Sequence, residues 1–348
     1  SSAGQLYTPV DSDQLMSYRE DKKGQMLEEG INEAGSTCSW IAAGTAYANH
    51  GTHMVPFYIY YSMFGFQRVG DFYWAAGDLR TRGFLLGGTA GRTTLAGEGL
   101  QHQDGHSLLH AATVPNCVAY DPTYAYELAV IIHDGMKRMF ANDESVFYYI
   151  AVMNENYVQP ALPKGVEEGI LKGMYLLQPG GAGKVRVTLM GSGTILREVI
   201  AAADILEKDF NIPSDIYSAP SFSELRREAL EIERWNRLHP GDKPRVPYVT
   251  QALSKATGPF IAATDYMRSW PDMVRQWVPG RFVTLGTDGF GRSDGRAALR
   301  KHFEVDAKNI AYASLQALAE EGALDKGTLK AALNKLGLDP NKLDPQKA

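Results

Sequence analysis

Three histidines stand four residues apart, at His102, His106 and His110. On a single helix they would share one face, a spacing that metal ligands can use. Gly105 would weaken such a helix, and Gln103 stands where a zinc peptidase needs its glutamate base. The glycines before His102 instead predict a loop that enters a helix, and such loops often carry functional residues. His102 is therefore a candidate functional residue, with a histidine that only stabilises the loop as the alternative.

Two glycine-rich segments could bind phosphate or metal, but each lacks part of the required pattern. Residues 190–193 (MGSG) follow an expected strand and open a helix, yet the third glycine of a dinucleotide fingerprint is absent. Asp215 lies at the start of its strand, where it could not reach a ribose. Residues 286–294 (GTDGFGRSD) lack the spacing and the closing glutamate of a calcium loop. We predict a tight turn at the first segment, and at the second a structured turn with local hydrogen bonds from Asp and Arg.

Aromatic residues are dense in residues 58–64 (YIYYSMF), at the junction of an expected strand and helix. Aromatic side chains commonly pack in protein cores, but a group of them at the carboxyl end of a strand also suits a flat heterocycle. Glu33 stands in an apolar, Ala-rich helix start. Taken by itself, an acid at that position is typical of an exposed residue or of a partner for the helix terminus.

Composition limits the classes of partner. The chain has 348 residues and a net charge of -5, with no basic excess for nucleic acid. The length predicts two domains. No apolar run approaches the ~18 residues of a membrane span, so we expect no membrane insertion. Two cysteines, Cys38 and Cys117, form no disulfide framework, and without a signal peptide pattern we expect a cytoplasmic protein.

Strand and helix patterns alternate along the chain, which predicts an α/β fold of two domains with mainly parallel sheets. The expected strands are residues 55–60, 83–87, 117–120, 145–152, 185–190, 214–218, 260–263 and 282–285. The expected helices are residues 32–49, 64–76, 123–140, 195–210, 222–237, 267–278, 295–302, 306–321 and 326–336. Residues 1–23 predict an exposed arm, and residues 178–183 (QPGGAG) predict either an inter-domain boundary or a tight turn.

Several segments taken together resemble one family, the single-chain homodimeric bacterial pyruvate dehydrogenase. They are residues 24–35 (GQMLEEGINEAG), 56–68 (PFYIYYSMFGFQR), 91–95 (GRTTL), 97–102 (GEGLQH) and 286–294. The resemblance covers essentially the whole chain. It implies a transketolase-like architecture, with a pyrimidine-binding domain at residues 1–163, its start missing, and a carboxy-terminal α/β domain at residues 164–348. The signature of the family's diphosphate-binding domain, Gly-Asp-Gly with a later Asn, is absent.

The resemblance implies thiamine diphosphate as the cofactor, with Mg²⁺ ligands on the missing domain and no metal ligand in this chain. Glu33 matches the glutamate that bonds ring atom N1′ and favours the imino form of the 4′-amino group. Phe64 matches the aromatic residue that stacks on the pyrimidine, and Arg68 lies beside it. Tyr61, Glu98 and His102 match polar residues at the substrate end. His102 would orient the pyruvate carboxylate or relay a proton during transfer to lipoamide, and Glu98 would join that proton network.

The implied activity is that of pyruvate dehydrogenase (acetyl-transferring), an oxidoreductase. The implied partners are pyruvate, the lipoyl domain of the dihydrolipoamide acetyltransferase, the missing diphosphate-binding domain or a second subunit, and a second copy in a homodimer. We expect the isolated chain to be inactive. One alternative is ketol transfer, as in transketolase or the deoxyxylulose phosphate synthases, although no basic cluster for a distal phosphate stands near the motifs. A second alternative is a non-catalytic chain that serves dimer contacts.

Overall fold

The first sheet has four strands, all parallel. The computed structural model describes residues 4–10, 12–13, 18–97 and 99–348. The strand order is β1 (Phe57–Tyr61), β2 (Phe84–Gly88), β4 (Phe147–Ala151) and β3 (Cys117–Tyr120). All five residues of β4 are buried, as expected for a central parallel strand with helices on both faces. Because parallel strands end at the same edge, the segments that follow β1 and β2 are neighbours in space.

The second sheet has the order β5 (Tyr175–Gln178), β7 (Ser214–Ser218), β6 (Val187–Gly191), β8 (Phe260–Ala263) and β9 (Phe282–Leu285). Only the edge pair of β5 and β7 is antiparallel. The fold class predicted from the sequence is therefore confirmed. Strand β5 was not expected; it lies at the edge of the sheet, where only Tyr175 of its four residues is buried. Gln178 ends β5, and residues 179–183 belong to the loop that leads to β6 of the same sheet, so this segment is not a boundary between sheets.

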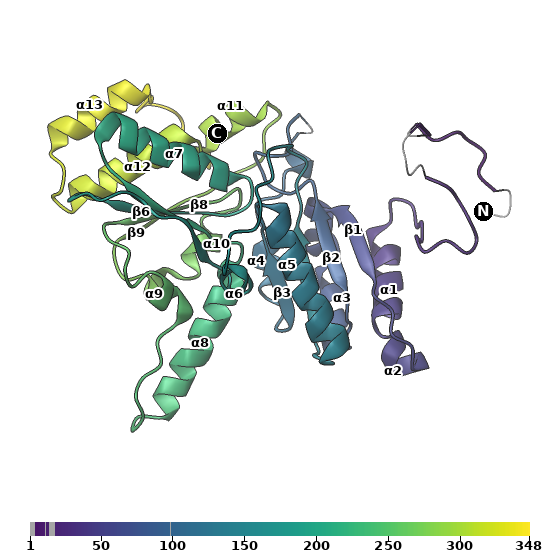
Figure 1. Cartoon of the computed structure of the whole chain (residues 1–348). Helices are drawn as coiled ribbons and strands as arrows, with labels where there is room; N and C mark the ends of the chain where they lie inside the picture. Colours follow the sequence, from purple (N-terminus) through teal and green to yellow (C-terminus); the bar gives the residue numbers. More distant parts are fainter. Residues whose placement is uncertain (1–3, 11, 14–17, 98) are drawn as a thin grey trace.

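Helices cover both sheets (Figure 1). The first sheet is accompanied by α1 (Glu33–Gly44), α2 (Ala46–His50), α3 (Phe66–Asp78), α4 (Ser107–Ala111) and α5 (Ala125–Met136). The second half contains α6 (Glu167–Lys172), α7 (Ile195–Phe210), α8 (Phe222–Leu238), α9 (Tyr248–Ala252), α10 (Ser269–Asp272), α11 (Arg296–Phe303), α12 (Ala307–Glu320) and α13 (Lys326–Leu336). In the described part of the chain, no helix is long and apolar enough to cross a membrane.

Two helix predictions need correction. The expected helix at residues 32–49 is interrupted at Thr45, which separates α1 from α2. The expected helix at residues 267–278 is only the short α10 and a following 3₁₀ turn. Trp270, Val274 and Trp277 have helical spacing and all are buried, which explains the prediction. Several amides in this segment donate to carbonyls three residues back, so the backbone winds more tightly than an α-helix.

One apolar core runs through both halves of the chain. Its members include Tyr60, Leu85 and Tyr149 on the first sheet, and Met190 and Phe260 on the second. Helices α4, α8 and α10 contribute to the same cluster. A core shared in this way resists relative movement of the two sheets, because movement would expose apolar surface. The division into domains at residues 163 and 164 stays a prediction.

Within the described residues before Glu33, the chain forms neither helix nor strand. Figure 1 shows this part looping away from α1. Met26, Leu27 and Ile31 are exposed there. The prediction of an exposed arm at residues 1–23 agrees with the described part of that segment, and its remainder, residues 1–3, 11 and 14–17, lies outside the described residues.

Candidate functional site

The carboxylate of Glu33 is held at the start of α1. Asn32 caps this helix, because its side chain accepts a hydrogen bond from the amide of Gly35 at 3.1 Å. Glu33 is thus the first helical residue, where the partial positive charge of the helix terminus favours an anion. Arg68 Nη1 donates to Glu33 Oε2 at 3.0 Å, and the Glu33 side chain is only 12% exposed. The same guanidinium lies 4.3 Å from the centre of the Phe64 ring. The carboxylate is therefore largely shielded and fixed in direction.

An aromatic group adjoins this ion pair at the carboxyl end of β1. The centre of the His102 ring lies 5.2 Å from that of Phe64 and 5.8 Å from that of Tyr61, both edge to face. The structure therefore brings together Glu33, Tyr61, Phe64, Arg68 and His102. Glu98, the remaining candidate, lies outside the described residues. This arrangement offers a carboxylate, a cation and aromatic rings at one end of a sheet.

The three spaced histidines do not share a helix. His102 ends a short 3₁₀ turn, Leu100–His102, and His106 precedes α4, in which His110 lies. The loop entering a helix is therefore confirmed. Among the residues that the structure describes, no three His, Cys, Asp or Glu side chains are placed to hold a metal ion.

Asp104 is a buried residue that the sequence reasoning missed. Its carboxylate accepts hydrogen bonds from the amides of His106 and Ser107, at 3.0 and 2.9 Å, and from the Ser107 hydroxyl. Gln67 Nε2, on the helix that carries Arg68, donates to the same carboxylate at 2.7 Å. Asp104 thus joins the loop of His102 to the helix of Arg68. Asp104 accepts from the amides two and three residues after it, as in an Asx turn, just before α4, whose N-cap position is His106; this local pattern could have identified it.

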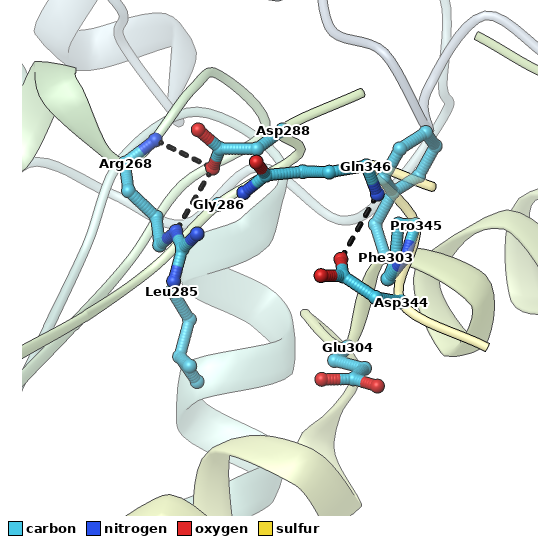
Figure 2. A pocket seen from close by; sticks show the side chains of 9 residues that line it. All are labelled: Arg268, Leu285, Gly286, Asp288, Phe303, Glu304, Asp344, Pro345 and Gln346. Atoms are coloured by element: carbon cyan, nitrogen blue, oxygen red, sulfur yellow. Dashed lines mark hydrogen bonds and ion pairs between the residues drawn. The ribbon is translucent and has the colours of Figure 1, made fainter. Parts of the chain in front are cut away.

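Both glycine-rich segments form turns, as predicted. Gly193, in the first segment, has a positive φ of 50°. The Asp215 carboxylate accepts hydrogen bonds from Arg186 and from the amide of Gly180, so its partners are those of a structural residue and not of a ribose-binding one. In residues 286–294, Asp288 Oδ2 accepts hydrogen bonds from the backbone amide and Nε of Arg268, both at 3.1 Å (Figure 2). Arg268 lies outside this segment, so these bonds are not the local contacts that were expected; the bond from the amide of Gly295 to Asp294 Oδ1, at 2.7 Å, is a local one.

Buried acids lie where the two sheets meet. Asp265, after β8, accepts hydrogen bonds from Thr93 and Thr94, which follow β2. Asp121, after β3, accepts one from the Ser192 hydroxyl at 2.7 Å, after β6. Burial raises the pKa of both carboxyl groups, that of Asp121 to about 8, while the bond from Ser192 lowers it and the charge of Asp265 raises it further. These acids join segments from both halves.

The pKa of Asp121 predicts a pH dependence of stability. The folded chain holds the proton up to about pH 8, whereas an unfolded aspartate releases it near 3.8. This group's contribution is thus fully present below pH 3.8 and is lost as the pH rises through 8. Asp121→Asn keeps the shape and cannot titrate. Between pH 5 and 8, the free energy of unfolding by urea should therefore fall more steeply for the parent chain than for Asp121→Asn. Parallel pH profiles would show that Asp121 is ionised in the folded chain.

The chain matches two protein families. Residues 1–160 match the family described as "Pyruvate dehydrogenase E1 component middle domain". Residues 173–306 match the family described as "Transketolase-like TK C-terminal domain". The Glu33 site lies wholly within the first match, and residues 286–294 lie within the second.

Curated relatives are similar along almost the whole chain. The pyruvate dehydrogenase E1 component of Pseudomonas aeruginosa is 61% identical over 347 residues, which are 99% of this chain and 39% of that protein. The protein of the same name from Escherichia coli K12 is 55% identical over 350 residues, 100% of this chain and again 39% of the relative. The chain thus spans about 39% of the length of these relatives.

Solved structures with a similar fold include transketolases. The transketolase of Leishmania mexicana has a TM-score of 0.61 and 14% identity, and covers 84% of this chain and 37% of that one. A structure titled "Split gene transketolase, inactive beta4 tetramer" has a TM-score of 0.57 and 15% identity, and covers 83% of both chains. At this identity the likeness concerns the fold alone. On the sequence matches, residues 1–160 belong to the family of pyruvate dehydrogenase E1 component middle domains, and residues 173–306 belong to the family of transketolase-like C-terminal domains.

Proposed function

We propose that this chain is part of a thiamine-diphosphate-dependent pyruvate dehydrogenase component, which decarboxylates pyruvate and reductively acetylates lipoamide. The observation that carries the proposal is the grouping of Glu33, Arg68, Phe64, Tyr61 and His102 at the end of β1, in a chain 61% identical to a pyruvate dehydrogenase E1 component. Residues 35 to 41 positions apart in sequence meet there. This grouping is what a site for a flat, charged heterocycle and a small anionic substrate requires.

The residues present fit the pyrimidine ring of thiamine diphosphate. Glu33 offers a shielded carboxylate, and Phe64 offers an aromatic ring beside it. When bound, the cofactor supplies the electron sink for decarboxylation. Glu33 holds a proton between its carboxyl group and ring atom N1′, and Phe64 orients the ring by stacking. Arg68 fixes the direction of the Glu33 carboxylate through their ion pair.

His102 and Tyr61 serve the substrate end of the site. Their rings lie 5.8 Å apart, and the His102 ring contacts Phe64, so a substrate at the cofactor would lie within reach of both. The imidazole of His102 orients the pyruvate carboxylate, or passes a proton during acetyl transfer to lipoamide. Glu98 takes part in the same proton network in this proposal.

A chimera tests the function. In it, this chain replaces the region of the Pseudomonas aeruginosa protein that it matches. The chimera should release CO₂ from pyruvate and acetylate an isolated lipoyl domain, and it should not transfer a ketol group from xylulose 5-phosphate. Ketol transfer without pyruvate decarboxylation would favour the transketolase alternative. A folded chimera that binds thiamine diphosphate yet turns over neither substrate would favour the non-catalytic alternative. The homodimer and the cytoplasmic location stay predictions.

The isolated chain should not bind magnesium thiamine diphosphate with useful affinity. The diphosphate and Mg²⁺ carry most of the charge by which the cofactor is recognised, and Mg²⁺ bound with phosphates is usually held by one or two carboxylates of the protein. The proposal assigns those ligands to the diphosphate-binding domain. Isothermal calorimetry of the 348-residue chain should therefore show no binding at micromolar concentrations, and the chimera should show it. Micromolar binding by the isolated chain would contradict this assignment.

A further inference from the structure

Two loops from opposite halves of the chain pack directly against each other. The histidine loop (residues 99–106) carries His102, and the clamp loop (residues 286–294) follows β9. The amide of Arg292 donates to Gln103 Oε1 at 2.7 Å. A Cβ atom added at Gly291 would lie 2.6 Å from the same oxygen, and one added at Gly99 would lie 2.9 Å from Ser293 Oγ. The two loops are therefore in contact at several points, without room for further side chains.

Arg92 joins the two loops from within. Its side chain is buried, with only 5% exposure. Nη1 donates to the carbonyl oxygens of Thr287 and of Gly289, the latter at 2.5 Å. On the other side, Nη2 lies 3.4 Å from His106 Nδ1, and a Cβ atom at Gly105 would lie 2.5 Å from Arg92 Cζ. The planar guanidinium reaches both loops at once, which the single ammonium of lysine cannot do.

The C-terminal tail (residues 339–348) backs the clamp loop. Gly289 has a φ of 113°, and a Cβ atom there would lie 2.5 Å from the carbonyl oxygen of Pro345. Lys342 Nζ fastens the tail, because it donates to the carbonyl oxygen of His302 at 2.6 Å and pairs with Glu304 at 2.9 Å. Figure 2 shows the end of the tail facing the start of the clamp loop, on either side of a small cavity lined by Arg268, Leu285, Gly286, Asp288, Phe303, Glu304, Asp344, Pro345 and Gln346.

We propose that Arg92 is a positioning residue for His102, and that the C-terminal tail holds the clamp loop in the place from which Arg92 can do this. Arg92 acts through the backbone of the clamp loop on one side and through Gly105 and His106 on the other. His102 lies four residues before His106 in the same histidine loop. The second half of the chain thus sets the position of a side chain at a site that belongs to the first half.

Hydrogen exchange of the 348-residue chain tests this proposal independently of any activity. In Arg92→Lys, the amides of the histidine loop should exchange at least about tenfold faster, since the side chain that holds this loop against the clamp loop is lost and local opening becomes easier. Deleting residues 339–348 should have the same effect on the clamp loop and a smaller one on the histidine loop. Amides of β3 and α7 should be unchanged in both. Arg82→Lys is the matched control, because Arg82 is also 5% exposed and pairs with Asp143 at 2.6 Å, away from both loops.

Unchanged exchange of the histidine loop in Arg92→Lys would overturn the role of Arg92, and unchanged exchange of the clamp loop in the deletion would overturn that of the tail. If Arg92→Lys fails to fold, the deletion decides: faster exchange confined to the two loops supports the coupling between them, and exchange confined to the tail refutes it.

The consequence for turnover rests on the proposed function. In the chimera, Arg92→Lys should lower the rate of pyruvate decarboxylation at least about tenfold, while hydrogen–deuterium exchange at C2 of bound thiamine diphosphate stays within about twofold. Arg82→Lys should leave both unchanged. A purely structural role would lower both rates together, and that result would overturn the positioning role. A parent chimera without turnover would count against the proposed function alone, because exchange in the 348-residue chain tests the loops without it.

Discussion

Replacement of Glu33 by glutamine in the chimera should slow hydrogen–deuterium exchange at C2 of bound thiamine diphosphate by roughly 10²–10⁴-fold, the usual size of general acid–base assistance. Glutamine keeps the shape of the side chain and can still accept a hydrogen bond from Arg68. It cannot share a proton with ring atom N1′, so the assistance to C2 is lost. Because only the charge is removed, the free energy of unfolding should change little.

The measurement is C2 exchange followed by NMR after acid quench, in parent and variant at saturating cofactor. Glu144→Gln provides the matched control, because Glu144 also pairs with an arginine, Arg138 at 2.7 Å, but lies after α5 and away from the site. The control should exchange at the parent rate. If Glu33→Gln exchanges C2 as fast as the parent, the assignment of Glu33 is wrong, and with it the central residue of the proposed site.

Replacement of His102 by alanine should impair substrate turnover and leave cofactor activation nearly unchanged, in contrast to Glu33→Gln. Pyruvate turnover and acetylation of the lipoyl domain should fall by roughly 10²–10⁴-fold, since a group that orients the substrate or transfers its proton is lost. C2 exchange should stay within about twofold of the parent rate, because the His102 ring lies edge to face against Phe64 and Tyr61, whereas the Glu33 carboxylate pairs with Arg68.

The control for this substitution is His110→Ala. His110 stands eight residues later, in α4, and is exposed. It should leave both rates unchanged. Stopped-flow decarboxylation and lipoyl acetylation, measured beside C2 exchange, separate cofactor activation from substrate chemistry. Equal loss of C2 exchange and turnover in His102→Ala would place His102 in cofactor activation and contradict the division of roles proposed here.

The sequence alone determined most of the elements, for a physical reason. Strands of parallel sheets are covered on both faces, so they appear in the sequence as short apolar runs that can be recognised without the tertiary structure. Strands β3, β7, β8 and β9 have the predicted bounds, as do α7 and α13. The prediction failed at two places where the local pattern did not determine the backbone conformation. Strand β5 lies at an edge, and in residues 267–278 apolar residues at helical spacing occur in a tighter winding.

The contacts of the candidate site also divide into those that follow from the local sequence and those that depend on the tertiary structure. Phe64 and Arg68 are four residues apart at a helix start, so their contact follows from local geometry. The loop pattern made His102 a candidate and the resemblance to a family singled out Glu33, but only the tertiary structure brought Glu33 to Arg68 and His102 to Phe64.

Contacts made by backbone groups could not be predicted from any sequence pattern. Arg92 binds the carbonyl oxygens of Thr287 and Gly289, almost two hundred positions later in the chain. Every residue carries such a carbonyl, so nothing in the side chains marks the partner. Asp104 likewise forms a local turn before α4, as its residue type suggests, but its bond from Gln67 depends on how α3 packs beside the histidine loop. Local side-chain types thus determined which groups could act, and the packing of the two sheets on one core decided which of them meet.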